Sequence, residues 1–210
     1  MKVFNEVRAE HFLSKFIPVA KSVLIRGIKN INLKLPFPLV LKIISEGALH
    51  KTEIAGVRFV NSNSELEKNF LELLETAKRK RIKFGGVLAQ EKLSGVECII
   101  GIKRDVVFGH VILFGVGGVF SEVIGDTNIR KCPIKEEDAE EMINELKSRA
   151  LFLDKGFRGR RINRSLLKKT LVKISKIPLS NKNISELDIN PFILGEKIGK
   201  VADARIVFED

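Results

Sequence analysis

The sequence of this 210-residue chain predicts an α+β (α/β) protein made of two lobes that share a cleft. Three strand candidates, which begin at Val87, Val96 and His110, follow one another closely and favour an antiparallel meander. Segments with apolar residues at helical spacing occur between other strand candidates, and no internal repeat or low-complexity linker interrupts them. The hydrophobic content of 44% is enough to bury a core in one domain or in two small lobes.

In the first half of the chain, a helix is expected from about Val7 to Phe16. The apolar run from Pro38 to Ile44 predicts a buried strand that leads into a loop from Ser45 to Gly56. Ser64 and Glu67 have the spacing of a capping box. A second helix is predicted after them by apolar residues at helical spacing, namely Leu66, Phe70, Leu73, Leu74 and Ala77.

In the second half, helices are expected from about Glu136 to Arg149 and from about Ser165 to Lys176. Two short apolar runs follow, ELDINP from Glu186 to Pro191 and VADARIVF from Val201 to Phe208. They predict paired strands that are joined by a turn-rich segment from Gly195 to Gly199.

Three oxygen-bearing side chains lie on these two strands: Asp188, Asn190 and Asp203. Because side chains alternate along a strand, Asp188 and Asn190 point the same way, and the neighbouring strand brings Asp203 beside them. Two carboxylates and an amide oxygen suit Mg²⁺ held jointly by the protein and by nucleotide phosphates. An acidic cluster among apolar strands would be unfavourable to bury without such a cation. The same spacing also fits a solvated hairpin with ordinary surface acids.

Three further segments contain residue types that suit phosphate chemistry. The segment from Phe114 to Glu122 places glycines after a strand, where bare backbone approaches an anion, although a strand-to-strand turn explains it equally well. Lys42 lies in an apolar strand, where an ammonium group needs either an anion or a solvent-facing edge. His50 and Lys51 follow a glycine-containing loop; an imidazole is a competent nucleophile toward phosphoryl groups, and it is also an ordinary polar loop residue.

The net charge of +11 indicates attraction for anionic molecules such as nucleotides and CoA. Basic residues gather at Lys78–Lys83 and Lys155–Arg164, but no nucleic-acid-binding motif or interleaved aromatic residue accompanies them, so nucleic acid is not expected as a partner. No apolar run is long enough to cross a bilayer, and the N-terminal residues lack the apolar core of a secretory signal. Cys98 and Cys132 lack metal-ligand spacing and are expected to be inert buried thiols in the cytoplasm.

Many segments of the chain, taken in order, resemble the ATP-grasp β subunit of ADP-forming acetyl-CoA synthetases, the NDP-forming acyl-CoA synthetase family. The resemblance covers nearly the whole chain, and so many segments in one order are more specific than any single motif. The segments are FIPVA (16–20), LVLKIIS (39–45), LHKTEIAGV (49–57), VLAQEKLSGVECIIGIKRDVVFG (87–109), FGVGGVFSEVIGD (114–126), the stretch 130–133, KGFRG (155–159), ELDINP and VADARI.

This resemblance implies a single ATP-grasp domain over residues 1–210, with two α+β lobes and the nucleotide between them. The smaller lobe is expected at about 15–88 and the larger at about 89–210 together with the N-terminal helix. The implied activity is that of the β subunit of an ADP-forming acyl-CoA (acetate–CoA) ligase, which transfers a phosphoryl group between a phosphohistidine of the α subunit and ADP or ATP. The implied partner is a CoA-binding α subunit in an α2β2 assembly, and Mg²⁺ accompanies the nucleotide.

The resemblance also carries over residue roles. His50 matches a histidine that ferries the phosphoryl group, with Lys51 as the charge beside it, and Asp188 matches the acid that faces the phosphohistidine. Asn190 and Asp203 match magnesium ligands. The expected nucleotide and phosphate contacts are Lys42 at the phosphates, the hinge residues Gln90, Glu91 and Leu93 at the adenine, Glu97 just beyond them, and Arg130 at a phosphate, with Glu122 and Asp126 on the loop that leads to Arg130.

The chain departs from the family pattern at several positions. Residues 27–38 are shorter than their family counterpart, and Ala55 stands where glycine is usual. Lys135 replaces a threonine N-cap, which should weaken that helix start by about 1 kcal/mol. Asn163 stands in place of an aspartate, whereas the expected magnesium and phosphate residues are retained.

Two other functions remain open on this reasoning. One is a degenerate ATP-grasp module that binds nucleotide and regulates a partner without turnover; the retention of His50, Lys42, Asn190 and Asp203 favours an enzyme instead. The other is a succinyl-CoA synthetase-type β subunit, against which the acetyl-type segment LHKTEIAGV weighs. Recognition of the carboxylic acid is expected to belong to the α part.

Overall fold

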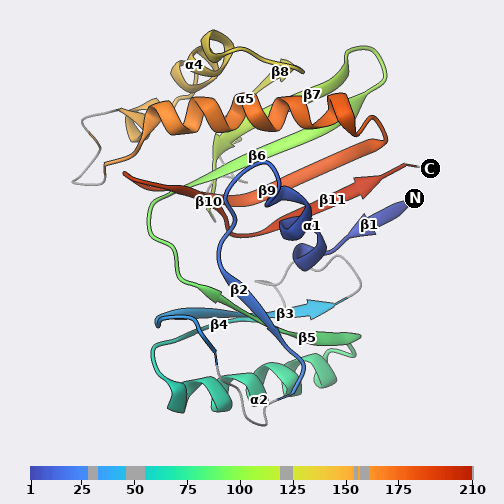
Figure 1. The fold of residues 1–210 in the computed structure, drawn as a ribbon, viewed down its shortest axis with the longest axis vertical. Helices are drawn as coiled ribbons and strands as arrows, with labels where there is room; N and C mark the ends of the chain where they lie inside the picture. Colours follow the sequence, from blue (N-terminus) through green and yellow to red (C-terminus); the bar gives the residue numbers. More distant parts are fainter. Residues whose placement is uncertain (28–32, 46–54, 119–124, 154–155, 157–160, 210) are drawn as a thin grey trace. The chain divides into compact units, whose positions relative to one another are not determined.

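Two compact units make up the chain in its computed structural model, which describes residues 1–27, 33–45, 55–118, 125–153, 156 and 161–209 (Figure 1). The larger unit comprises Met1–Val19 and Ser94–Asp210, and the smaller unit comprises Ala20–Leu93. These boundaries lie about five residues beyond the predicted ones, at 15 and 88. The shift arises because Ile17 packs in the larger core and β5 (Phe84–Glu91) stays in the smaller sheet to its last residue.

The larger unit is built on a seven-stranded antiparallel sheet with the order β1-β11-β9-β6-β7-β8, and β10 pairs with β9 beside this path. The predicted C-terminal strand pair is present as β9 with β11, and the turn at Gly195–Gly199 joins β9 to β10. The strands are β1 (Lys2–Phe4), β6 (Val96–Asp105), β7 (Gly109–Val116), β8 (Thr127–Lys131), β9 (Ile184–Leu194), β10 (Gly199–Val201) and β11 (Ala204–Phe208).

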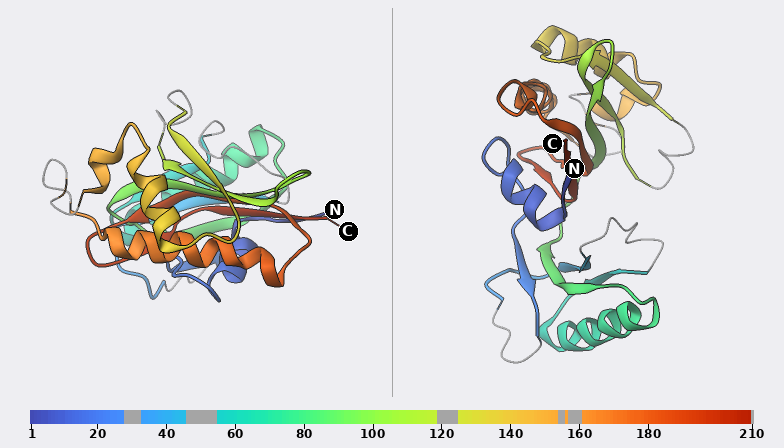
Figure 2. Two further views of the ribbon diagram at one scale, coloured as in Figure 1. Left: turned by 90° about the horizontal axis from the view of Figure 1, so that it is seen from above. Right: turned by 90° about the vertical axis from the view of Figure 1, so that its right-hand side faces the viewer.

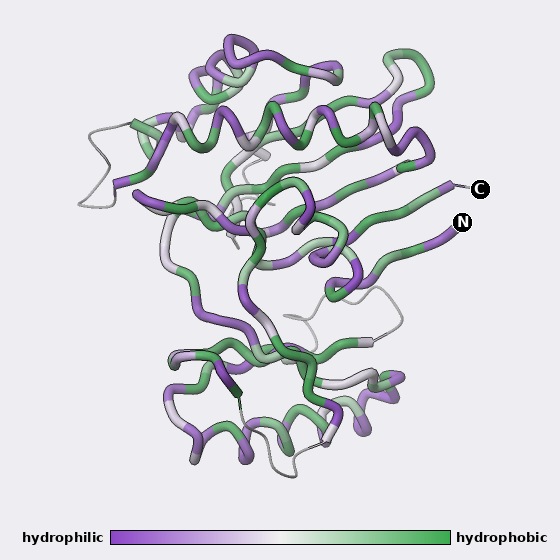
Figure 3. The backbone as a smooth tube through the Cα atoms, in the orientation of Figure 1, coloured by the Kyte–Doolittle hydropathy of each residue, from purple (hydrophilic) through white to green (hydrophobic). Residues whose placement is uncertain are grey.

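Helices cover one face of this sheet (Figure 2), namely α1 (Glu6–Leu13), α4 (Glu136–Asn144) and α5 (Arg164–Ser180). Hydrophobic and hydrophilic residues alternate along α5, as expected of a helix with one buried side (Figure 3). Leu13, Met142 and Leu171 of these helices share one apolar core with alternate residues of the strands. The strand residues in this core include Ile100, Ile102, Ile112, Leu187, Ile189 and Ile206. Their neighbours along each strand therefore point to the opposite face.

Hydrogen bonds from Arg164 connect the start of α5 to α4 and to the 3-10 helix Arg149–Phe152. Its buried guanidinium donates hydrogen bonds to the Glu140 carboxylate at 2.5 Å, to Asn144 Oδ1 at 2.6 Å and to the Phe152 carbonyl at 3.0 Å. Lys168 Nζ lies 3.1 Å from the same carboxylate. The hydrogen bond from Arg164, assisted by Lys168, lowers the pKa of Glu140 to about 2.

The smaller unit has a four-stranded antiparallel sheet with the order β2-β5-β3-β4. Its other strands are β2 (Ser22–Ile25), β3 (Leu39–Ser45) and β4 (Val57–Val60), and α2 (Asn63–Arg79) covers one face (Figure 2). Leu39, Leu41 and Ile43 pack with α2 in a second apolar core. Because side chains alternate, Val40 and Lys42 point to the face away from α2.

The predicted meander of three successive strands is only partly correct. β6 and β7 form the expected antiparallel hairpin, but β5 pairs with β3 and β2 in the other sheet. The Lys92 N–H continues the pairing of β5 by donating to the Pro38 carbonyl at 3.2 Å. Close spacing along the sequence shows that strands follow one another, but it does not show which sheet each joins.

Several predicted helix boundaries shift. The N-terminal helix ends at Leu13, α4 ends at Asn144, and α5 continues to Ser180 with Pro178 inside it. The predicted capping box at Ser64 and Glu67 is wrong, because α2 has Ser62 as its N-cap and the Glu65 carboxylate accepts from the Asn61 N–H at 2.8 Å. No helix in the described part of the chain has the length and apolar character needed to span a bilayer.

Two departures from the family pattern lie at helix starts. Lys135 is the N-cap of α4; its side chain has no acceptor, but the Asp138 carboxylate accepts from the Lys135 N–H at 2.7 Å. Asn163 is the N-cap of α5, and its Oδ1 accepts from the Leu166 N–H at 2.8 Å. Asparagine thus performs the capping that an aspartate would perform.

Candidate functional site

Asp188, Asn190 and Asp203 lie on the face of the seven-stranded sheet away from the helices. Asp188 on β9 is directly across from Arg205 on β11. The Asn190 N–H donates to the Asp203 carbonyl at 3.1 Å, so these two residues are opposite each other at the end of the pairing. Residues opposite each other in a sheet share a face. Strand pairing therefore places the three side chains on one face, as the alternation predicted.

The surroundings of Asp188 disfavour its ionised form. Burial raises the pKa of Asp188 to about 6, and the carboxylates of Glu186 and Asp203 contribute to the rise, while Arg205 opposes it. A cation among these oxygens would relieve both the burial and the repulsion. The donor set and its electrostatics therefore fit a divalent cation.

The protein supplies only part of a magnesium coordination shell at this site. Within the described residues, no three Asp, Glu, His or Cys side chains come together as a metal-binding group. Asp188, Asn190 and Asp203 offer at most two carboxylates and one amide oxygen, so water and phosphate oxygens would have to complete an octahedral shell. This arrangement is typical of a metal that the protein shares with a nucleotide rather than of a structural metal.

Arg205 is a candidate that the sequence reasoning missed. Its Nη1 lies 3.6 Å from the Glu186 carboxylate, and its buried Nε has no hydrogen-bond partner among the described residues. A buried N–H without an acceptor is unfavourable, which favours a ligand oxygen at this position. The spacing was an available signal, because Arg205 follows Asp203 by two residues in the predicted strand Val201–Phe208 and was therefore expected to point the same way.

Glu97 lies on the same sheet face, on β6 across from Ile193 of β9. The glycine-rich segment approaches it closely, since the Gly117 N–H donates to the Glu97 carbonyl at 2.7 Å. A Cβ at Gly117 would lie 3.1 Å from the Glu97 carbonyl carbon, and Gly118 has a φ of 95°. Contact with β6 therefore explains the glycine at Gly117 without a bound anion.

In the smaller unit, Lys42 and Gln90 lie together on the sheet face away from α2. Lys42 is 7% exposed and Gln90 is 2% exposed. The Lys42 ammonium donates to Gln90 Oε1 at 2.9 Å. A buried ammonium group on this sheet face is suited to an anionic ligand.

The predicted hinge residues lie at the end of β5 and just beyond it. The Glu91 carboxylate accepts from the Lys21 N–H at 2.7 Å, and the Glu91 N–H donates to the Lys21 carbonyl at 2.9 Å. These bonds tie the end of β5 to the segment before β2. Leu93 is the last residue of the smaller unit.

Arg130 does not lie on the same sheet face as Asp188, Asn190 and Asp203. It lies on β8 across from Ile112, whose side chain points into the core under the helices. Its guanidinium lies 2.6 Å from the Glu145 carboxylate and 3.9 Å from that of Glu141. Arg130 therefore occupies the opposite sheet face from Asp188, and the hydrogen bond that its guanidinium donates to Glu145 raises the pKa of Arg130.

The remaining predicted residues divide into two groups. His50, Lys51 and Glu122 lie outside the described residues. Asp126 has a structural role, because its carboxylate accepts from the backbone N–H groups of Lys147 and Ser148 at 2.9 and 2.8 Å and from the Ser148 hydroxyl.

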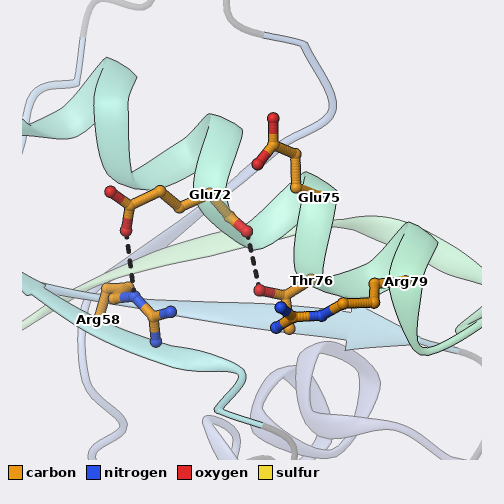
Figure 4. Close-up of a pocket in the computed structure, with 5 residues that line it drawn as sticks. All are labelled: Arg58, Glu72, Glu75, Thr76 and Arg79. Carbon is orange, nitrogen blue, oxygen red and sulfur yellow. Dashed lines mark hydrogen bonds and ion pairs between the residues drawn. The ribbon is translucent and has the colours of Figure 1, made fainter.

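A hollow of about 310 Å³ lies between β4 and α2 in the smaller unit (Figure 4). Its lining residues are Arg58, Glu72, Glu75, Thr76 and Arg79. An ion pair between Arg58 and Glu72, at 3.5 Å, crosses it. None of the predicted site residues lines this hollow, and Arg58 pairs with Leu41 on the α2 side of the sheet, so the hollow is separate from Lys42.

Comparison with known proteins identifies the family of the chain. A family profile described as an ATP-grasp domain matches residues 2–208. An ADP-forming acetate–CoA ligase of Methanocaldococcus jannaschii is 38% identical over 97% of this chain, and an ADP-forming acetate–CoA ligase I of Archaeoglobus fulgidus is 35% identical over 81% of it. The chain spans only 30% and 25% of those two proteins. It spans 75% of the β subunit of the corresponding ligase I of Pyrococcus furiosus, with 34% identity over 81% of this chain.

Solved structures agree with this assignment. A dinucleotide-forming acetyl-coenzyme A synthetase 1 of Ca. Korarchaeum cryptofilum, in complex with coenzyme A, Ca-AMPCP and HgCl⁺, has a TM-score of 0.92 and 38% identity over 99% of this chain and 94% of its own. A selenomethionine form of that synthetase with coenzyme A and Mg-AMPPCP has its phosphohistidine segment pointing towards the nucleotide-binding site; it has a TM-score of 0.84 and 37% identity over 99% and 93% of the two chains. This chain is therefore an ATP-grasp domain and belongs to the family of ADP-forming acetate–CoA ligases.

Proposed function

We propose that this chain is the nucleotide-binding β part of a cytoplasmic ADP-forming acyl-CoA ligase that uses acetate or a related acid. In this role it transfers a phosphoryl group between a phosphohistidine of an α partner and ADP, and it is active only with that partner in an α2β2 assembly. The role of the β part is supported by the P. furiosus relative, which is named a β subunit and of which this chain spans 75%.

The observation that carries this proposal is the placement of Asp188, Asn190 and Asp203 on one sheet face without helical cover. A carboxyl group such as Asp188, whose ionisation is disfavoured by burial and by neighbouring carboxylates, is expected where a cation normally neutralises it. Lys42 is a buried ammonium in the smaller unit, and its charge suits the phosphates of a nucleotide.

Magnesium fits the residues on the larger sheet. Asn190 and Asp203 would hold it from the protein side, and phosphate oxygens of the nucleotide would complete its shell. When bound, Mg²⁺ supplies charge neutralisation for the oxygens of the transferred phosphoryl group. The buried Nε of Arg205, on the same face, supplies a donor for a ligand oxygen.

The other residues have distinct tasks in the proposed transfer. Lys42 positions the nucleotide phosphates by charge. Asp188, ionised above a pKa of about 6, accepts a hydrogen bond from the partner imidazole and fixes its orientation. A phosphate oxygen of ADP forms the new P–O bond as the P–N bond breaks, and the electron pair of that bond returns to the imidazole nitrogen. His50 relays the phosphoryl group before this step. Its imidazole nitrogen forms a P–N bond as the P–N bond to the partner imidazole breaks, and the ADP oxygen then displaces the His50 nitrogen, which keeps the electron pair. Lys51 supplies positive charge next to His50 in the sequence.

The experiment that tests this function separates nucleotide binding from synthesis. The purified chain should bind Mg·ADP but make no ATP from acyl-CoA, ADP and phosphate until the CoA-binding α partner is added. Turnover by the chain alone would contradict the division of labour. Binding of Mg·ADP without turnover in the reconstituted complex would instead support a non-catalytic nucleotide-binding module.

A further inference from the structure

We propose that Phe59 and Lys92 form a platform for the base of the bound nucleotide on the smaller unit. This inference rests on the proposed function and adds two residues that the family resemblance leaves unassigned. The pair is called the Phe59–Lys92 platform below. It would take the planar base of a nucleoside diphosphate or triphosphate, whichever purine that base is.

The strand register puts Phe59 close to the predicted phosphate and hinge residues. Phe59 on β4 lies directly across from Val40 on β3, and Val40 lies across from Gln90 on β5. These three residues form one row on the sheet face away from α2. Lys42 is two residues further along β3 on the same face, which separates it from this row by about 6–7 Å.

That separation fits the layout of a nucleotide. If the phosphates meet Lys42 and the base lies toward the hinge at Leu93, the base crosses the row that contains Val40 and Phe59. Lys92 stands between Glu91 and Leu93, so it belongs to the hinge segment itself. The platform is therefore formed by two segments, β4 and the hinge segment, whose side chains meet on this sheet face.

Phe59 is largely exposed to solvent rather than packed in the core. It is 60% exposed, although Phe70 and Phe84 of the same unit pack against each other at 6.3 Å between ring centroids. Lys92 Nζ lies over the Phe59 ring, 5.2 Å from its centroid. A cation over the ring restrains its orientation, and the ring surface that remains exposed suits stacking of a base.

Single exposed apolar residues are common on protein surfaces and need no function. Leu71 on α2 is such a residue in the same unit, with 45% exposure. Phe59 differs from it in two respects: its row includes Gln90, and a lysine of the hinge segment lies over its ring. Leu71 therefore serves as the matched control for truncation of an exposed apolar side chain.

The test compares ligands with and without a base by calorimetric titration of the full chain with Mg²⁺ present. Phe59→Ala should weaken binding of ADP and GDP alike by about 5- to 50-fold, because base stacking on an aromatic ring accounts for that range. Binding of pyrophosphate, which lacks the base, should change by less than about twofold. Phe59→Leu should lose most of the same affinity, and Lys92→Gln should lose about 2- to 5-fold.

The controls keep the outcomes distinct. Leu71→Ala should bind all three ligands as the wild type does, and thermal unfolding should show that Phe59→Ala remains folded. Equal ADP affinity in the wild type and Phe59→Ala would overturn the platform, as would an equal loss for ADP and pyrophosphate. A wild-type chain that binds neither ADP nor pyrophosphate would overturn the proposed function itself, and the platform with it.

Discussion

Replacing Asp188 with asparagine should stabilise the metal-free chain. Burial, first of all, raises the pKa of Asp188 from 3.8 to about 6. A carboxyl group whose pKa is higher in the folded state than in the unfolded state costs stability as pH rises from about 4 to above 6. Taken in full, this pKa shift corresponds to a loss of about 3 kcal/mol in the free energy of unfolding. We expect about 1–2 kcal/mol, because the side chain keeps partial contact with solvent.

Thermal unfolding of the metal-free chain, followed by circular dichroism at pH 8 and pH 4, measures this effect. Asp188→Asn should raise the unfolding midpoint by about 2–6 °C at pH 8. The gain should be much smaller at pH 4, where the folded-state carboxyl is already protonated. Glu186→Gln is the comparison variant, because it removes the same charge from the same sheet face at a side chain that is 47% exposed. It should raise the midpoint less than Asp188→Asn, because it removes part of the repulsion but leaves the buried Asp188 carboxyl in place. Equal midpoints for the wild type and Asp188→Asn at pH 8 would refute the reasoning.

Four further predictions concern the ligands and the fold. Asp203→Asn should raise the Mg²⁺ concentration needed for half-maximal ADP binding by about tenfold or more, because a charged magnesium ligand is lost. A magnesium titration of ADP binding would measure this concentration. Lys42→Met should weaken Mg·ADP binding by about 10- to 100-fold in a calorimetric titration, because a charge-assisted bond to phosphate is lost. Glu140→Gln should lower the unfolding midpoint at pH 7 but not near pH 2, because the lowered pKa of Glu140 gives stability that is present above about 4.5 and lost as pH falls toward 2. His50→Ala in complex with the α partner should still bind ADP while radiolabelled phosphohistidine accumulates on that partner.

Each of these four predictions would be contradicted by a particular result. Glu186→Gln with as large a magnesium effect as Asp203→Asn would mean that general charge, not a ligand, was removed. Unchanged ADP affinity in Lys42→Met would separate this lysine from the phosphates. A midpoint difference for Glu140→Gln that persists at pH 2 would exclude the ion pair as its cause. ATP formation at the wild-type rate in His50→Ala would exclude the relay.

The common sheet face of Asp188, Asn190 and Asp203 could be predicted from the sequence because strand alternation is a strictly local rule. Once Asp188 and Asn190 are placed on one strand and Asp203 on its neighbour, their common face follows from the period of two. Lys42 was predicted for a related reason, since an ammonium group within an apolar strand needs a partner. In the structure it is 7% exposed and bonded to Gln90.

Other features depend on pairing between distant segments, which local patterns do not encode. Arg130 is two residues from Asn128, and both point toward α4 because β8 pairs with β7 in a particular register. A shift of one residue would have turned Arg130 to the face of Asp188. The assignment of β5 to the smaller sheet also depends on its distant partner β3. The buried Nε of Arg205 is likewise visible only when the strands around it are in place.

The pairing of β1 with β11, with Lys2 opposite Phe208, has a consequence for the order of folding. Residues 20–93 form a continuous unit, whereas the larger unit joins residues 1–19 to residues 94–210. During synthesis, residues 20–93 can complete their own sheet early. By contrast, β1 and α1 contact β11, which is synthesised about two hundred residues later, so they cannot pack until then. Contacts between such distant segments form slowly because of the loop-closure entropy. The β1 edge of the larger sheet should therefore be the last part of the chain whose backbone N–H groups become protected against hydrogen exchange during refolding.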